Sequence, residues 1–152
     1  MTSDATHEEA VSILQELGLR EYEAKCFVGL SRMSRGTAKG LSEVTEVPRT
    51  RVYDAVRILE AKGLVEVQHS SPQQFRAVPL SEATETLRDQ YEERVERLQS
   101  ALREMGSIES DDEDAELQEV WSLSGSDAIE NRAAAIIGDA TDEVVLVIGA
   151  EA

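Results

Sequence analysis

Cysteine and histidine are nearly absent from this sequence, which holds only Cys26, His7 and His69. One cysteine excludes a disulfide within the chain, and the lack of a Cys/His cluster excludes a zinc site of the usual kind. Long apolar runs are also missing. The longest near the C-terminal end, residues 144–148, is far shorter than the roughly 20 residues that span a bilayer, and residues 1–9 are polar and acidic. We therefore expect a cytoplasmic protein that uses no metal or cofactor.

Aromatic residues and positive charge are scarce as well. Aromatics make up 4% of the 152 residues, so the core must form mainly from aliphatic residues among the 41% that are apolar, enough to exclude wholesale disorder. The 15 basic residues face 31 acidic ones, and the resulting charge of −16 argues, over the whole chain, against a nucleic-acid partner. With 12 arginines and three lysines, the composition is typical of an extreme halophile's protein; an ordinary acidic mesophile protein is the alternative.

The charge is unevenly distributed along the chain. Residues 1–80 carry 10 basic and 11 acidic groups, a net charge of −1, whereas residues 81–152 carry 5 and 20, a net charge of −15. Within the first part, residues 32–57 hold six basic side chains against three acidic ones. This small basic island leaves the first 80 residues open to a nucleic-acid partner.

Four short helices and a hairpin are predicted in residues 8–79. Helical spacing of apolar residues indicates helices over 8–17, over 22–33, from 37 onward and over 48–62. Only Thr45 and Glu46 separate the third helix from Val47, and Pro48 suits the first turn of the fourth because its missing N–H needs no partner there. After Gly63 the apolar spacing changes to every second residue, which predicts a β-hairpin. This order is typical of a winged helix-turn-helix, an α+β fold whose fourth helix enters the major groove of DNA.

The predicted fourth helix has two different faces. Its apolar residues follow the spacing i, i+3, i+4, i+7 and must pack on the first three helices; they are Val52, Ala55, Val56 and Leu59. The opposite face carries guanidinium and hydroxyl groups that can bond base edges near the helix start, with Arg51 on the flank suited to phosphate. The candidate DNA contacts are Lys39, Arg49, Thr50, Arg51, Tyr53 and Arg57, with Ser70, Gln73 and Arg76 on the wing. Asp54 on this face can accept from cytosine, orient Arg51 or Arg57, or deter wrong sequences.

A long helix over residues 80–106 follows the hairpin. One narrow apolar stripe runs along it at spacings of 4 and 3, and its members are Leu87, Tyr91, Val95, Leu98, Leu102 and Met105. An amphipathic helix of this kind needs a partner, so we expect a coiled coil that makes a homodimer. Residues 107–119 are an acidic linker.

Residues 120–152 have the pattern of a partial βαβ unit. Strands are expected at 120–123 and 144–148, with a helix from about 126 to 137 between them. Trp121 is expected in a core, with ligand stacking as the alternative. One such unit cannot bury both faces of its strands, so either the chain is truncated or that face packs on another surface.

Several segments together resemble the TrmB family of archaeal winged-helix transcriptional regulators. They are ELGLREYEAKCFVGL, then GTAKGLSEVTEVPRTRVYDAVRILEAKGLVEVQ, then FRAVP and the long helix, roughly residues 8–105. The resemblance implies a dimeric regulator that binds operator DNA through residues 48–62. The later EVWSLSGSDAIENRAAAIIGDATDEVVLVIG resembles the start of that family's phospholipase-D-like effector domain, but family members with sugar-sensing domains continue much further. We therefore expect no small-molecule effector site in this truncated chain.

The sequence leaves two alternatives for Cys26 and two for the function of the chain. Cys26 is either a small buried hydrophobe or a redox switch whose pKa is lowered by the neighbouring Lys25. No carboxylate pair stands beside a nucleophile, so we expect no enzyme. The leading hypothesis is a sequence-specific DNA-binding regulator; the alternative is a protein–protein interaction module built on a winged helix without specific DNA binding.

Overall fold

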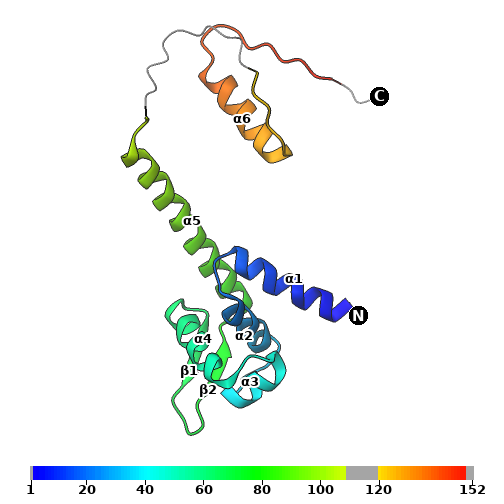
Figure 1. Cartoon of the computed structure of the whole chain (residues 1–152), viewed down its shortest axis with the longest axis vertical. Helices are drawn as coiled ribbons and strands as arrows, with labels where there is room; N and C mark the ends of the chain where they lie inside the picture. The colour runs from blue at the N-terminus through cyan, green and yellow to red at the C-terminus, as the bar shows by residue number, and fades with distance from the viewer. Residues whose placement is uncertain (1, 109–119, 150–152) are drawn as a thin grey trace. The chain divides into compact units, whose positions relative to one another are not determined.

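The computed structural model describes residues 2–108 and 120–149. The chain divides into two compact units, Met1–Ser107 and Ile108–Ala152. In the first unit the elements are α1 (Thr2–Glu16), α2 (Glu21–Ser31), α3 (Ala38–Thr45), α4 (Arg49–Ala61), β1 (Val65–Gln68), β2 (Gln74–Ala77) and α5 (Leu80–Met105). In Figure 1, α2, α3 and α4 gather around the hairpin, and α5 extends away from them. The α+β class and the winged helix-turn-helix order are confirmed.

The core lies among the helices and the inner face of the hairpin. It is almost wholly aliphatic, as the shortage of aromatic residues predicts, with Phe27 and Phe75 as its aromatic members. The largest fully buried side chains include Leu30, Leu41, Leu59, Leu64, Val47 and Val52, contributed by α2, α3, α4 and the adjoining loops. Because each of the helices α1 to α5 supplies part of this cluster, α4 is held by packing from several directions.

The helix ends follow the predicted signals except at the start of α1 and at the end of α2, which stops at Ser31 instead of residue 33. Helix α1 begins at Thr2, six residues earlier than the expected start at residue 8, since polar residues also form its first turns. The chain leaves α1 through Gly18, whose φ of 103° favours glycine, and the N–H of Leu19 donates to the carbonyl of Leu14 at 3.0 Å. Gly63 ends α4 in the same way, with a φ of 76° and a bond from Leu64 N–H to Leu59 carbonyl. Both are Schellman-type ends that turn the chain sharply.

The joint between α3 and α4 is held by side-chain bonds to the backbone. Thr37 caps α3 by accepting from the N–H of Gly40 at 3.2 Å. At the other end, the Thr45 hydroxyl donates to the Leu41 carbonyl at 2.7 Å, and Ser42 donates to the Val47 carbonyl at 2.6 Å. Glu46 takes the left-handed conformation with a φ of 59°. The turn is therefore fixed at both sides, which sets the direction in which α4 begins.

The hairpin pairs β1 and β2 antiparallel, with Val65 opposite Ala77 and Val67 opposite Phe75. Gly36 adds a further bridge, because its N–H and carbonyl exchange bonds of 2.9 and 2.8 Å with Phe75. The loop after α2 therefore joins the sheet edge. A Cβ atom at position 36 would lie 3.0 Å from the Met33 side chain, so glycine suits this close approach of the loop to β2.

The first part of α5 belongs to the core of the winged-helix domain. Ala83 and Leu87 are buried there, with Leu87 only 4% exposed. The prediction that Leu87 begins the dimerisation stripe is therefore wrong, because this residue already packs within its own chain. The remaining members of the stripe, from Tyr91 onward, are exposed.

Within residues 120–149, the second unit forms the predicted helix as α6 (Ser126–Asp139). The strands expected at 120–123 and 144–148 are absent from the described residues, which run as irregular backbone at those positions. Trp121 is 84% exposed, so the expected core position is also wrong. The physical reason is that strand formation requires hydrogen-bonded neighbours, and these short apolar segments pair with no strand in the described part of the chain.

Candidate nucleic-acid interface

The two faces of α4 separate as the sequence pattern predicts. Val52, Ala55, Val56 and Leu59 are buried. The other face presents Arg49, Thr50, Arg51, Tyr53, Asp54 and Arg57 to solvent. Since the buried side fixes the rotation of the helix, the hydroxyl groups and Arg57 are held on the opposite side, with Arg49 and Arg51 on its two flanks.

The N-terminal end of α4 is exposed together with these side chains. Pro48 is the capping residue, and its carbonyl accepts from the N–H groups of Arg51 and Val52 at 2.8 and 3.0 Å. The first N–H groups of any α-helix have no carbonyl partner within it, and the helix dipole makes this end positive. Arg49 and Thr50 stand on this first turn. The site therefore combines backbone donors, a hydroxyl and a guanidinium, which suits an anionic backbone such as that of DNA.

Asp54 lies beside Arg51 on the same surface. The Arg51 Nη1 and the Asp54 carboxylate are 3.9 Å apart, and both side chains are more than half exposed. Of the roles left open for Asp54, the geometry favours orienting Arg51. An exposed pair at this distance is weak, so Arg51 can turn toward another anion at little cost.

Tyr53 joins α4 to the wing. Its ring meets that of Phe75 on β2 edge to face, with 6.3 Å between ring centroids and 85° between planes. Phe75 is buried, whereas Tyr53 is 40% exposed, so one edge of the Tyr53 ring remains accessible. This contact places the exposed face of α4 beside the hairpin.

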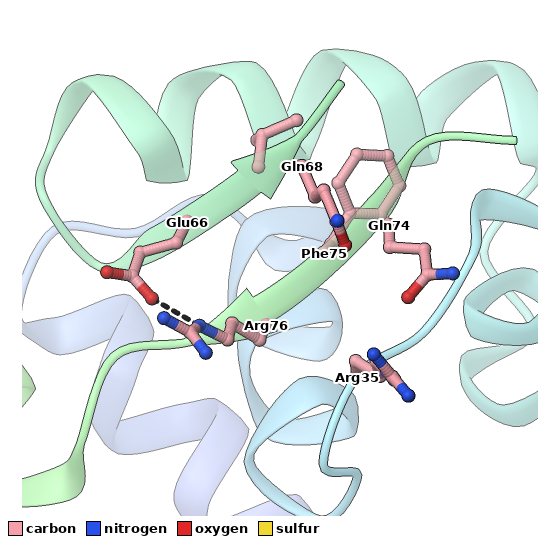
Figure 2. Close-up of a pocket in the computed structure, with 7 residues that line it drawn as sticks. Arg35, Glu66, Gln68, Gln74, Phe75 and Arg76 are labelled. Carbon is pink, nitrogen blue, oxygen red and sulfur yellow. Dashed lines mark hydrogen bonds and ion pairs between the residues drawn. The ribbon is translucent and has the colours of Figure 1, made fainter. Parts of the chain in front are cut away.

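The predicted wing residues differ in the bonds that they form within the chain. Ser70 donates to the Pro72 carbonyl at 2.8 Å, and the amide of Gln73 lies 3.2 Å from His69 Nδ1. Both side chains therefore help to shape the hairpin loop. Arg76 forms an ion pair with Glu66 across the hairpin, as Figure 2 shows. The positive charge of Arg76 is thus partly neutralised within the chain.

A shallow pocket on the outer side of the hairpin contains a residue that the sequence reasoning did not select. Arg35 lines it together with Glu66, Gln68, Gln74 and Arg76. Figure 2 shows Arg35 reaching this region from the loop beside β2. The signal was present in the sequence as the basic turn Ser34-Arg35-Gly36, but only the Gly36–Phe75 bridge brings that turn to the wing.

The remaining predicted contact, Lys39, is exposed on the first turn of α3. The nine predicted DNA contacts thus come from α3, α4 and the hairpin, and Gln73 alone among them is partly buried.

Cys26 lies in the core of the domain, fully buried on α2. Burial raises the pKa of its thiol to about 12. The prediction that Lys25 lowers this pKa is wrong, because the Lys25 ammonium pairs with Glu21 at 2.5 Å on the outer side of the helix. The thiol behaves as a small buried hydrophobe.

Within residues 2–108 and 120–149, no group of three or more His, Cys, Asp or Glu side chains could hold a metal ion. Among these same residues, no helix has both the length and the apolar character needed to cross a membrane.

A helix-turn-helix with an arginine-bearing fourth helix and an adjoining hairpin defines the winged-helix class of transcriptional regulators. Residues 14–81 match the family described as "Sugar-specific transcriptional regulator TrmB". The winged-helix domain of this chain is therefore similar to the TrmB family, and two curated relatives are described as transcriptional regulators, a non-enzymatic role.

Two curated relatives illustrate the match. The chain is 28% identical over 139 residues to the "HTH-type sugar sensing transcriptional regulator TrmBL1" of Pyrococcus furiosus, covering 91% of this chain and 40% of that protein. It is 36% identical over 86 residues to the "DNA-binding HTH-type transcriptional repressor TrmBL2" of Thermococcus kodakarensis, covering 56% of this chain and 33% of the relative. The chain thus spans less than half the length of either.

Solved structures agree with the fold. The structure titled "Structure of TrmBL2, an archaeal chromatin protein, shows a novel mode of DNA binding" matches with a TM-score of 0.58 and 32% identity, over 66% of this chain and 39% of that one. A possible transcriptional regulator from Methanosarcina mazei matches with a TM-score of 0.50 and 14% identity, over 65% of this chain and 88% of that one, and supports the fold alone.

Proposed function

We propose that this chain is a sequence-specific DNA-binding regulator that acts as a dimer and places α4 in the major groove. The observation that carries the proposal is the outward face of α4. Its buried side is fixed in the core, and the opposite side with its two flanks presents Arg49, Arg51 and Arg57 beside the wing. An exposed helix of this kind, after a tight joint, fits the major groove of B-DNA.

Within this surface the side chains have different roles. Arg49 and Thr50, at the start of α4, reach base edges, where a guanidinium can bond guanine at two points. Arg51 binds phosphate from the flank after leaving Asp54. Tyr53 and Arg57 complete the α4 contacts, and Lys39 binds the backbone from α3.

The wing supplies backbone contacts beside α4. Ser70, Gln73 and Arg76 extend the surface along the hairpin, and Arg76 exchanges its bond to Glu66 for a phosphate. Because these contacts do not read bases, they add affinity and set the register of the domain on DNA.

The exposed stripe of α5 supplies the dimer contact. Tyr91, Val95, Leu98, Leu102 and Met105 are each at least 49% exposed and follow spacings of 4, 3, 4 and 3. This heptad-like pattern is typical of a two-stranded coiled coil, in which two copies bury such stripes against each other. We assign residues 8–79 to DNA binding, 80–106 to pairing, 107–119 to a linker and 120–152 to part of an effector unit. No sugar or other effector is part of the proposal.

The test is DNA binding by the whole chain. Selection from random duplexes identifies the preferred sequence, and fluorescence anisotropy then measures affinity over a range of KCl concentrations. Arg49→Ala should weaken the preferred duplex by about 1–3 kcal/mol and relax specificity at one base pair. Arg51→Ala should weaken all duplexes alike and make the salt dependence less steep. Arg103→Ala, on the far end of α5, is the matched control and should bind as the parent does.

Failure of the parent chain to select any sequence would overturn this function. The alternative, an interaction module without specific DNA binding, predicts that outcome, with Arg49→Ala and Arg51→Ala indistinguishable from the control.

A further inference from the structure

The middle of α5 contacts the C-terminal ends of two other helices. Side chains at the ends of helices commonly satisfy the last backbone carbonyls, which lack partners within the helix. Here these partners come from a different element: α5 supplies Gln90 and Arg94, which bond carbonyls at the ends of α4 and α1 respectively. The three helices thus meet at a polar junction, defined as Gln90, Arg94, Lys62 and the Leu17-Gly18 turn.

The contact with α1 is close and requires glycine. Arg94 Nη1 donates to the Leu17 carbonyl at 2.8 Å. A Cβ atom at Gly18 would lie 1.8 Å from the same nitrogen, and the φ of 103° at this position also disfavours any side chain. The guanidinium therefore occupies the space that the missing side chain leaves.

The contact with α4 centres on Lys62. Its carbonyl accepts from Gln90 Nε2 at 2.9 Å. Its ammonium donates to the Gly18 carbonyl at 3.3 Å and lies 3.6 Å from the carboxylate of Glu23, whose side chain is only 4% exposed. Glu23 in turn accepts from the Arg20 N–H at 2.9 Å at the start of α2. One chain of bonds thus links α5 to the recognition helix α4 and to the two helices that support it.

The junction also fixes which face of α5 is offered to a second copy. Ala83, Leu87, Gln90 and Arg94 recur at spacings of 4, 3 and 4 and face the domain. The exposed apolar stripe from Tyr91 to Met105 lies on a neighbouring face, about 70° around a helix of 3.6 residues per turn. A change in how the first face docks would rotate the second face by the same angle.

We propose that this junction sets the spacing of the two DNA half-sites that the dimer recognises, by fixing the rotation of α5 relative to α4. The inference rests on the proposed dimeric DNA binding. Two α4 helices can enter successive major grooves only when their separation matches the helical repeat of the DNA. Gln90, Lys62 and Arg94 are therefore positioning residues, which determine specificity for spacing without touching a base.

The first experiment compares spacing preference. Paired half-sites, taken from the selected sequence, are separated by inserts that differ by one base pair. The parent should lose at least about tenfold in affinity when the spacing changes by one step, because the two half-sites rotate and separate together. Gln90→Ala with Arg94→Ala should bring neighbouring spacings within about threefold of each other while keeping the half-site sequence. Arg97→Ala, one turn further along α5, is the matched control and should keep the parental preference.

Retention of the parental spacing preference by the double variant would overturn the inference. If the double variant does not fold, as judged by circular dichroism, Arg94→Ala alone is used in the same assay and is subject to the same criterion. A parent chain that binds no selected half-site at all would instead contradict the proposed function, so the two failures are distinguishable.

A second measurement requires no DNA. Cys26 is fully buried, so a spin label introduced through Ser70→Cys at the exposed wing reports the wing-to-wing distance in the dimer. The labelled parent should give one narrow distance distribution, and Gln90→Ala with Arg94→Ala should broaden or shift it, with Arg97→Ala unchanged. Equal distributions for the parent and the double variant would overturn the inference.

Discussion

Tyr53 on α4 and Phe75 on β2 meet edge to face, with their ring centroids 6.3 Å apart. Phe75 also exchanges two backbone bonds with Gly36, in the loop that precedes α3. Helix α4, the hairpin and the loop that holds Arg35 are therefore all connected to the buried Phe75. Movement of the wing relative to α4 has to break this contact, so the domain presents its candidate DNA surface as one body.

Two substitutions of Tyr53 distinguish the packing of its ring on Phe75 from a contact of its hydroxyl with DNA. Tyr53→Phe keeps the ring and should leave the free energy of unfolding within about 0.5 kcal/mol of the parent. Tyr53→Ala removes the aromatic pair, which contributes about 0.5–1.5 kcal/mol, and should lower the free energy of unfolding by at least that amount. Urea unfolding measures both. If Tyr53→Phe weakens DNA binding without loss of stability, the hydroxyl contacts DNA; equal stability of Tyr53→Ala and the parent would contradict the packing role.

Gly18→Ala should destabilise the domain for two reasons. The left-handed backbone costs a side chain about 1–2 kcal/mol, and displacement of Arg94 loses a hydrogen bond of about 0.5–1.5 kcal/mol. Urea unfolding of Gly18→Ala, Arg94→Ala and the double variant forms a cycle. Because both single changes remove the same Arg94–Leu17 bond, the double variant should be less destabilised than the two single losses added together. Simple additivity would show that the two positions do not interact.

Cys26 should be inert in the folded protein. A thiol-specific reagent such as Ellman's should react with it at the rate of global unfolding, and quickly in denaturant, since the thiol is buried. Diamide should leave DNA binding unchanged in both the parent and Cys26→Ala. Rapid reaction of the native protein, or a response to diamide that Cys26→Ala removes, would restore the redox-switch interpretation.

The raised pKa of Cys26 also predicts a pH dependence of stability. The unfolded thiol ionises with a pKa of about 8.5, whereas burial raises the pKa of the folded thiol to about 12. Its contribution is complete below the unfolded pKa and is lost as the pH rises toward the folded value. The parent should therefore lose stability relative to Cys26→Ala between about pH 9 and 12, measured by urea unfolding at each pH. A constant difference would contradict the assigned pKa.

Leu87 and Leu98 should respond differently to truncation, although both belong to one apolar pattern on α5. Leu87→Ala removes a buried side chain and should cost about 2–5 kcal/mol of unfolding free energy. Leu98 is 58% exposed, so Leu98→Ala should leave the unfolding of the domain nearly unchanged at low protein concentration and weaken dimerisation, as measured by sedimentation. Equal effects on unfolding would argue that the two stripes are not distinct.

The winged-helix part could be predicted because its signals are local. The spacing of Val52, Ala55, Val56 and Leu59 gave the buried face of α4, and the structure confirms it. Thr37 begins α3 as its N-cap, as its position before the predicted helix indicates. Pro48, predicted in the first turn of α4, instead caps it one residue earlier. Where a helix begins and which face is buried depend on neighbours a few residues away, and those are visible in a sequence.

Other features depend on partners distant in the chain. The bond from Arg94 to Leu17 spans 77 residues and ends on a backbone carbonyl, which no side-chain pattern reveals. The spacing of 4 from Leu87 to Tyr91 continues the apolar pattern without a break, so the pattern does not reveal that Leu87 packs on its own domain. The apolar segments at 120–123 and 144–148 have strand composition, but strands form only against hydrogen-bonded neighbours.

The length of α5 has an electrostatic consequence. Its 26 residues, at about 1.5 Å each, carry the chain about 39 Å from Leu80 to the point where the acidic stretch begins. The screening length of salt is about 8 Å at physiological ionic strength and about 30 Å at 0.01 M. The helix itself carries seven acidic and four basic side chains. Most of the negative charge of residues 81–152 therefore follows α5 along the chain, after a helix several screening lengths long at physiological ionic strength.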